Sequence, residues 1–485
     1  MLTVKSIRNG PYARNENLSF EAKRSRFYIN STTKLSQWEF PGLSNPESQS
    51  ESSPATQAVN QRQTPVRRLS NWYAKQRKRS DTLPAGSTTI LQDKEAVNSA
   101  KEMTSTVTTL SRWPTNMRSQ LEADLDSIRE KHSVAALMVG VVSANGPTEL
   151  FLRGLRRVGS KATVTSADKC MLSVNDSMTL TILAMLVDRG LLRWEDQLTD
   201  FLPTSLHDQI HDKHKGTTFT MFASSMSGIC VDWFAAGSLM SYLSKLNFHA
   251  KQARIAIASY YLSRPPDNRP GASYCWHQAN SILITLALEE RTQQPFETLL
   301  KTMLFDPLGM SSASFGWPDR SANSAARPTQ PWGHHGTSKQ PQDIIMGNGL
   351  DMKACFPYQG IHCTAADYAI FVQYQLRCAM GVEQSGVLSR DGMTTLYEEI
   401  ENGGEYKSTR SGFSVGDPEW AHGLTYFMSG RAHGFSNTCR IAPRIRKAFF
   451  VLSNLGDQAG LRAVDDAVRA AILHQVMIDD EPEEL

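Results

Sequence analysis

The chain has 485 residues, of which 40% are apolar and 20% charged, enough for two or three average domains or one large one. This composition excludes wholesale disorder, a collagen-like repeat and a coiled-coil rod. The longest nearly apolar run, 178–187, is too short to cross a bilayer, so we expect no membrane span. The seven cysteines begin at Cys170 and lack CxxC spacing, which argues against a disulfide framework or a zinc ribbon.

The net charge of +3 hides an asymmetry. Residues 1–115 carry 17 Lys and Arg against 9 Asp and Glu, a net of +8, so the remaining residues carry −5. We therefore expect no nucleic acid to be bound through the folded domain. The stretch 43–66 is rich in Ser, Gln, Pro and Glu without an apolar period, which predicts that residues 1–115 are mostly disordered. No secretory signal is recognised, and we expect a cytoplasmic protein, with a mitochondrial or nuclear address left open by the basic residues.

Beyond residue 115 the apolar pattern becomes periodic. Apolar residues at helical spacing predict a helix over 117–132, and dense β-branched runs predict strands over 134–142 and 148–153 around an Asn-Gly-Pro turn. The strongest helix is expected over 177–192. Further helices are predicted over 250–262, 280–291, 295–304, 364–378 and 457–476, and strands over 438–441 and 447–452. Strands at both ends with helices between them predict an α/β sheet domain interrupted by a helical insertion.

Ser173 lies just before this strongest helix, and a serine there has two interpretations. Its hydroxyl can cap the helix by accepting a hydrogen bond from an orphan backbone N–H. It can also be a nucleophile, placed where the helix dipole favours developing negative charge. The residue alone does not separate these interpretations.

Seven phrases that follow one another along the chain resemble those of the serine β-lactamase and penicillin-binding-protein superfamily. The nucleophile phrase, Ser-x-x-Lys-x-x-Thr in that family, corresponds to Ser173, Asp176 and Thr179, followed by Gly190 and Leu198. The other phrases lie at 219–229, 270–280, 304–310 (Leu-Phe-Asp-Pro-Leu-Gly-Met), 330–334, 360–367 and 433–438 (His-Gly-Phe-Ser-Asn-Thr). Phrases in this order indicate the fold more strongly than the chemistry.

The resemblance implies an α+β fold, with an antiparallel sheet flanked by helices, an all-helical subdomain and the site between them. It covers roughly 116–475, with the sheet part at about 116–165 and 350–475 and the helical insertion at about 166–349. Residues 476–485 would form an acidic C-terminal tail. The segment between Gly423 and Arg446 is shorter than in the family, so a hairpin of the central sheet is expected to be trimmed, unless the gene model is incorrect.

The residues that handle protons in the family are replaced. Asp176 stands where a lysine activates the serine, and a carboxylate stabilised by the helix dipole is a poor base toward a hydroxyl. Trp276 replaces the family's tyrosine, and an indole N–H donates but cannot take up a proton near neutral pH. Ser173, Asp176, Trp276 and His433 are therefore the candidate catalytic positions, with altered chemistry.

Three further positions are candidate substrate-binding residues. Gln278 replaces the family's asparagine, His277 lies beside it, and Phe435 stands where a glycine would let a substrate lie against the strand, so its ring should crowd the oxyanion edge. His277 or His433 could serve as a substitute base, or both could be packed side chains. His334 and His335 lack Cys or acidic partners at ligand spacing, so no metal is expected, and no nucleotide-binding glycine loop implies a cofactor.

Two functions remain open. The resemblance implies a serine hydrolase or transesterase that attacks a small ester, amide or thioester through an acyl-serine on Ser173, as in the esterases and acyltransferases of small-molecule biosynthesis. This is the leading interpretation, with altered or impaired activity, because the replaced residues favour impaired acylation without excluding a different reaction in the same cleft. The alternative is a catalytically inactive pseudoenzyme that keeps the fold as a binding or scaffold module. A base within hydrogen-bond reach of Ser173 Oγ would separate the two. The partner in either case is a small molecule, and the oligomeric state stays open.

Overall fold

The structure is a computed structural model that describes residues 113–480 apart from 174, 231–248, 320–327, 336–339, 342–351 and 384. Before residue 113 it describes four strands of an antiparallel sheet: β1 (Lys5–Ser6), β2 (Leu18–Ala22), β3 (Ser25–Ile29) and β4 (Ser36–Glu39). The chain divides after Gln63 into two units. The sequence predicts that residues 1–115 are mostly disordered, yet these four strands are formed. The other residues up to 112 lie outside the described residues, and for them disorder stays a prediction.

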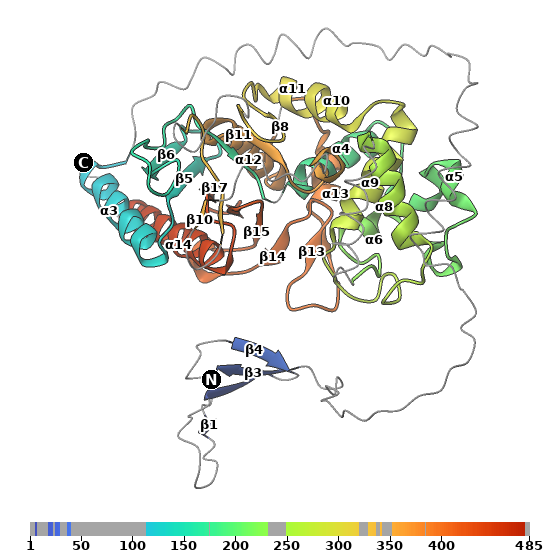
Figure 1. Cartoon of the computed structure of the whole chain (residues 1–485), viewed down its shortest axis with the longest axis horizontal. Helices are drawn as coiled ribbons and strands as arrows, with labels where there is room; N and C mark the ends of the chain where they lie inside the picture. The colour runs from blue at the N-terminus through green and yellow to red at the C-terminus, as the bar shows by residue number, and fades with distance from the viewer. Residues whose placement is uncertain are drawn as a thin grey trace, which may run out of the picture. The chain divides into compact units, whose positions relative to one another are not determined.

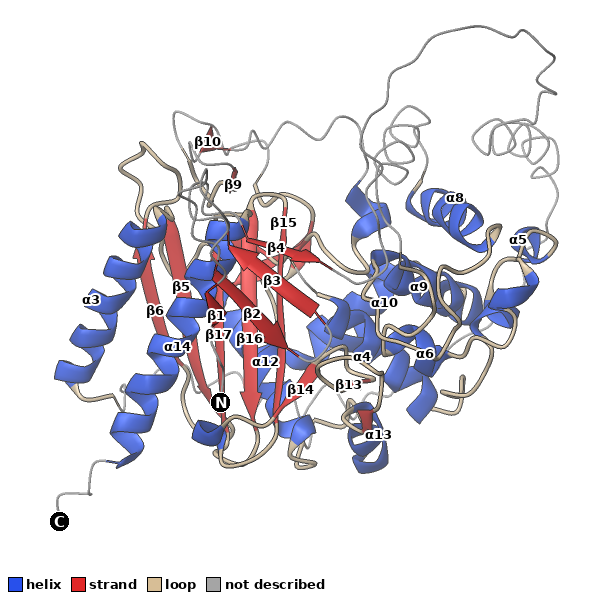
Figure 2. Ribbon diagram, turned by 90° about the horizontal axis from the view of Figure 1, so that it is seen from below, coloured by secondary structure: helices blue, strands red, loops and turns tan. Residues whose placement is uncertain are grey.

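An eight-stranded antiparallel sheet runs through the second unit (Figure 2) in the order β12-β13-β14-β15-β16-β17-β5-β6. Its strands are β5 (Ala136–Ser143), β6 (Glu149–Gly154), β12 (Glu399–Ile400), β13 (Ser408–Thr409), β14 (Ser414–Gly416), β15 (Thr425–Ala432), β16 (Phe435–Ala442) and β17 (Lys447–Ser453). The hydrogen-bonded pairing of β17 with β5 joins the two ends of the domain in one sheet. A smaller sheet has the order β7-β11-β8, and β9 pairs with β10. These strands are β7 (Lys169–Met171), β8 (Ser314–Phe315), β9 (His334–His335), β10 (Gln340–Pro341) and β11 (Ile361–Thr364).

Helices cover both faces of the large sheet. On one face α3 (Thr115–His132) and α14 (Gln458–Asp480) pack against the strands, and on the other face lies α12 (Ala365–Ala379). Because successive strand residues point to opposite faces, Val139 of β5 packs in the core under α3 and α14, while Met138 joins the core on the other side. The central strands are therefore apolar on both faces, which explains the dense β-branched runs of the sequence.

The remaining helices lie mostly beside the sheet, where Figure 1 shows α5, α6, α8 and α9 gathered away from α3 and α14. They are α4 (Asp176–Asp188), α5 (Thr204–His207), α6 (Phe219–Ala223), α8 (Ala250–Leu262), α9 (Gln278–Thr292), α10 (Phe296–Leu300), α11 (Asp306–Leu308) and α13 (Arg390–Leu396). Short 3₁₀ turns occupy Leu198–Phe201, Asp212–His214, Met352–Cys355 and Glu419–Ala421, and a π-helical turn occupies Lys301–Phe305.

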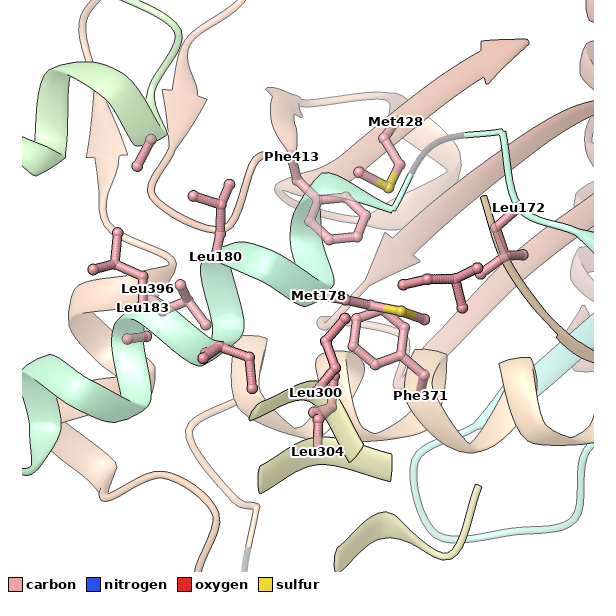
Figure 3. Close-up of a cluster of buried hydrophobic side chains, with 14 of the residues drawn as sticks. Leu172, Met178, Leu180, Leu183, Leu300, Leu304, Phe371, Leu396, Phe413 and Met428 are labelled. Atoms are coloured by element: carbon pink, nitrogen blue, oxygen red, sulfur yellow. The ribbon is translucent and has the colours of Figure 1, made fainter. Parts of the chain in front are cut away.

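Helix α4 is the buried centre of this arrangement. Every residue from its start at Asp176 to Leu186 is buried, as expected of a helix that is apolar on all sides. Figure 3 shows Met178, Leu180 and Leu183 of α4 among side chains from other elements, Phe371 of α12 among them. This packing fixes the position of the chain where it enters α4, directly after Ser173.

The fold class predicted from the sequence is confirmed: helices flank an antiparallel sheet, with further helices beside it. Helix α8 has the predicted bounds, whereas the helix expected over 177–192 already ends at Asp188, and the one over 295–304 divides into α10 and the π-helical turn. Within the described residues, no helix combines the length and apolarity needed to cross a membrane.

An ion triad centred on a buried arginine ties three helices together. Arg254 of α8 is fully buried and donates from Nη1 to Glu289 Oε1 of α9 at 2.6 Å and from Nη2 to Glu297 Oε1 of α10 at 2.7 Å. Removing one partner of a buried ion pair leaves an uncompensated charge, which costs about 3–5 kcal/mol. We therefore expect Arg254→Ala to lower the free energy of unfolding by about that amount, measured by urea denaturation.

Lys251→Ala is the matched control on the same helix. Lys251 pairs with Glu290 at 2.7 Å, but both side chains are partly exposed, and such pairs contribute about 0–1 kcal/mol. Equal losses of stability in the two variants would contradict a structural role for the triad.

Candidate functional site

Ser173 lies in the short connection between β7 and α4. The connection is held on both sides of it, because Leu172 N donates to Ile361 O at 2.8 Å and Asn175 Nδ2 donates to Phe356 O at 2.9 Å. Asn175, not Ser173, occupies the N-cap position of α4. The hydroxyl of Ser173 is turned instead toward the large sheet.

The partners of Ser173 come from two neighbouring strands. Ser173 Oγ lies 3.0 Å from Gly430 O of β15 and also donates to the side-chain oxygen of Asn437 in β16. The backbone N–H of Ser173 donates to the same Asn437 Oδ1 at 2.9 Å. Gly430 and Asn437 face each other in the strand register. The hydroxyl and the backbone N–H of Ser173 are therefore both hydrogen-bonded at the same place on the sheet.

Asp176 and Trp276, which lie 100 positions apart in the sequence, interact in the structure. Asp176 is 6% exposed at the start of α4, and Ser281 Oγ of α9 donates to its Oδ1. Burial raises the pKa of Asp176 to about 6, against the opposing effect of side-chain hydrogen bonds from Ser281 and Trp276. The Trp276 side chain is 47% exposed, so its indole reaches the carboxyl group while much of its surface remains open.

His277 and Gln278 begin helix α9. The ring of His277 caps the helix, because its Nδ1 accepts from Ala279 N at 3.0 Å, and it packs edge-on against Tyr261 with 4.8 Å between ring centroids. Burial lowers the pKa of His277 to about 4, so the ring is neutral at physiological pH. Gln278 follows as the first helical residue. The described contacts of His277 are thus structural and do not include Ser173.

His433 and Phe435 lie at the turn between β15 and β16. Ala432 pairs with Phe435, which leaves His433 and Gly434 as a two-residue turn with φ of 51° and 81°, the pattern of a type I′ hairpin. A Cβ on Gly434 would lie 2.7 Å from Gly333 backbone atoms, so the turn packs too closely for any other residue. That the segment between Gly423 and Arg446 is shorter than in the family stays a prediction.

The two side chains at this turn are packed on Trp317. The His433 ring lies edge-on to the Trp317 ring with 6.2 Å between the centroids, and the centroid of the buried Phe435 ring lies 6.1 Å from that of Trp317. Burial lowers the pKa of His433 to about 4. Neither side chain has a described contact with Ser173, and it is Asn437, two residues after Phe435, that reaches the serine.

The ring of His334 is held by the protein at both of its nitrogen atoms. Its Nδ1 lies 2.7 Å from Asn454 O and its Nε2 accepts from Val158 N at 3.1 Å, so both ring nitrogens have protein partners. Among the described residues, His, Cys, Asp and Glu form no group of three or more suited to a metal ion.

Sequence reasoning missed Gly430, Ser281 and Asn437 as members of this site. Asn437 falls within the family-like phrase at 433–438, which was its only signal. Its contact with Ser173 depends on the register of β15 against β16 and on the position of α4 beside them, and neither is encoded in a local pattern.

Comparisons with known proteins place this geometry in a family. The family model described as Beta-lactamase matches residues 170–474. The octameric penicillin-binding protein homologue from Pyrococcus abyssi is similar in structure, with TM-score 0.57 and 16% identity over 76% of this chain and 78% of that one. SurE is similar too, with TM-score 0.58 and 18% identity over 76% of this chain and 78% of that one, as is SurE with D-Leu, with TM-score 0.54 and 18% identity over 77% and 78%.

No curated protein matches the sequence. At these identities the similar structures establish the fold alone, whereas the family model spans more than half of the chain and includes Ser173. The chain therefore belongs to the β-lactamase family.

Proposed function

We propose that this chain is a member of the β-lactamase family that binds a small molecule at the Ser173 site without forming an acyl-serine. The observation that carries the proposal is the engagement of Ser173 by Asn437, whose side-chain oxygen accepts from both the hydroxyl and the backbone N–H of the serine.

None of the described hydrogen-bond partners of the Ser173 hydroxyl is a base. A serine attacks an acyl carbon only when a base takes its proton. The acceptors of Ser173 Oγ are the Gly430 carbonyl and the Asn437 amide, and neither group takes up a proton near neutral pH. Activation of Ser173 would require both partners to be replaced by a base.

The backbone N–H of Ser173 is engaged as well. In serine enzymes the N–H of the nucleophile commonly helps to stabilise the oxyanion of the tetrahedral intermediate. Here that N–H already donates to Asn437 Oδ1 at 2.9 Å. An oxyanion would have to displace the amide oxygen before it could gain this hydrogen bond.

The surroundings of Ser173 favour binding of a neutral or cationic molecule. Asp176 places a carboxyl group where the family has a lysine, so the local charge is reversed. Trp276 and Tyr274 are 47% and 41% exposed, and both interact with Asp176: Trp276 donates to it, and burial together with the Asp176 charge raises the pKa of Tyr274 to about 12. Partly exposed aromatic rings beside a carboxyl group suit an amine or another cation.

One observation favours the alternative, a hydrolase or transesterase that attacks a small ester, amide or thioester through Ser173. Asp176 lies three residues after Ser173 in the sequence, and its pKa of about 6 is close to the range in which a general base works at neutral pH. Its described hydrogen bonds, however, come from Ser281 and Trp276. For this reason we rank the alternative second.

Covalent labelling tests the proposal. Full-length protein is incubated with a fluorophosphonate, and separately with a β-lactam, and its intact mass is compared with that of Ser173→Ala. We expect no adduct on either protein, because Ser173 Oγ faces acceptors that cannot deprotonate it. A fluorophosphonate-reactive serine hydrolase is the positive control for the first probe, and a penicillin-binding protein is the positive control for the β-lactam.

An adduct present on the native chain and absent from Ser173→Ala would contradict the proposal. Loss of that adduct in Asp176→Asn, with labelling that increases as pH rises through about 6, would establish the carboxylate-assisted alternative. Persistence of the adduct in Asp176→Asn would instead assign activation to another base.

A second prediction concerns the pH dependence of stability. Burial raises the Asp176 pKa from 3.8 to about 6, so the folded protein retains a proton that the unfolded chain has released in this range. The resulting stabilisation is complete below the unfolded value and is lost as pH rises through about 6. The free energy of unfolding of Asp176→Asn, relative to that of the native chain, should therefore rise by about 3 kcal/mol as the pH increases from roughly 4 to neutral.

Urea denaturation of both proteins at a series of pH values measures this difference. Asp208→Asn, which changes an exposed side chain, is the matched control and should keep the pH dependence of the native chain. A pH-independent difference between Asp176→Asn and the native chain would show that Asp176 is not a buried acid.

A further inference from the structure

Two of the seven cysteines meet at the edge of the candidate site. Cys230 directly follows the family-like segment 219–229, and Cys275 directly precedes Trp276. Both are partly exposed, whereas Cys170, Cys355, Cys363, Cys378 and Cys439 are buried. Asn268 Nδ2 lies 3.2 Å from Cys230 Sγ and 3.4 Å from Ser273 Oγ, two residues before Cys275, and the two cysteine side chains interact with each other. Two partly exposed thiols therefore lie close together although 45 positions separate them in the sequence.

Backbone and side-chain hydrogen bonds hold the two cysteines in place. Cys230 N donates to Asp267 Oδ2 at 2.8 Å, and Cys275 N donates to Ser225 O at 2.7 Å. Asn268 bridges the same region, because its N donates to Gly228 O at 3.1 Å and its Nδ2 donates to Cys230 Sγ at 3.2 Å. The sulfur contact is therefore part of an ordered set of hydrogen bonds.

The surroundings assign different roles to the two sulfurs. The pKa of Cys275 is raised to about 12, chiefly by burial and then by the hydrogen bond with Cys230 and its charge. Cys275 therefore remains a thiol at neutral pH. Cys230 Sγ also receives the Asn268 side-chain N–H. The thiolate is the nucleophile in thiol oxidation, and burial disfavours the thiolate of Cys275, so we assign the first step to Cys230.

We propose that Cys230 and Cys275 form a redox-modification site that closes to an intrachain disulfide when the protein meets a peroxide. The Cys230 thiolate attacks one oxygen of hydrogen peroxide, the O–O bond breaks, and the departing hydroxide takes a proton to become water, leaving a sulfenic acid on Cys230. The Cys275 sulfur then attacks the Cys230 sulfur, loses its proton and expels a second water. In total, two thiols and one peroxide give one disulfide and two waters.

This bond would join the segment that carries Trp276 to the residue that follows the family-like phrase 219–229. The indole of Trp276 donates to Asp176, so oxidation acts on a chain segment that contributes directly to the candidate site. The proposal rests on the two sulfurs and their hydrogen bonds and does not depend on whether Ser173 is reactive.

The chain offers a matched internal control. Cys170 and Cys363 face each other across strands β7 and β11, so they also form a close pair. Both are fully buried, and burial raises the pKa of each thiol, which disfavours the thiolate. Because both thiols are buried, we expect Cys170 and Cys363 to stay reduced when peroxide is added, although they lie close together.

The test uses the full-length reduced chain and a small molar excess of hydrogen peroxide, followed by unfolding in N-ethylmaleimide and peptide mapping by mass spectrometry. We expect two of the seven cysteines to lose maleimide labelling and to appear as one linked peptide pair containing Cys230 and Cys275. Cys363→Ser should form the same link. Cys275→Ser should lack it and should accumulate a dimedone-reactive sulfenic acid on Cys230.

Full maleimide labelling of Cys230 and Cys275 after peroxide treatment would overturn the proposal. A cross-link that forms between chains, or one that involves Cys170 and Cys363 at equal yield, would overturn it as well. Circular dichroism of Cys275→Ser and Cys275→Ala separates loss of the link from loss of the fold, because the proposal requires both variants to keep the native spectrum.

Discussion

The hydrogen bonds between Asn437 and Ser173 are the constraint on which the rest of the site depends. They connect the middle of β16 to the chain just before α4, two segments 264 residues apart in the sequence. Both ends of the connection are rigid, since β16 lies within the large sheet and α4 is buried on all sides. Turning the Ser173 hydroxyl toward another base would break its hydrogen bonds to β15 and β16. We propose that the same packing that preserves the family fold holds the serine away from the family chemistry.

Charge reversal is the second departure, and the protein accommodates it locally. A buried carboxylate without donors would cost far more than a hydrogen-bonded one. Ser281 and Trp276 supply donors to Asp176, and burial still leaves its pKa near 6. The resemblance implies that Asp176 and Trp276 stand where the family has a lysine and a tyrosine. In this chain the two residues fit each other, because the Trp276 side chain stabilises the charged form of Asp176.

The sequence predicted the elements better than the contacts. Periodicity located α8 and the paired strands β16 and β17, because each pattern is local and reflects burial on one or both faces. The candidate positions Asp176 and Trp276 were found through their place in family-like phrases, and they do interact. Asn437 was missed as a partner of Ser173 because its contact is set by strand register over a long separation. His433 and Phe435 were predicted at the edge of the site, yet the two-residue turn packs both against Trp317.

Hydrogen exchange resolved to single amides tests the central claim most directly. The Ser173 N–H should exchange slowly in the native chain and should lose this protection in Asn437→Ala, because its acceptor is removed. The neighbouring Leu172 N–H, which donates to Ile361 O, should remain protected in both proteins and shows that the segment stays folded. Rapid exchange at Ser173 in the native chain, or protection unchanged by Asn437→Ala, would contradict the account.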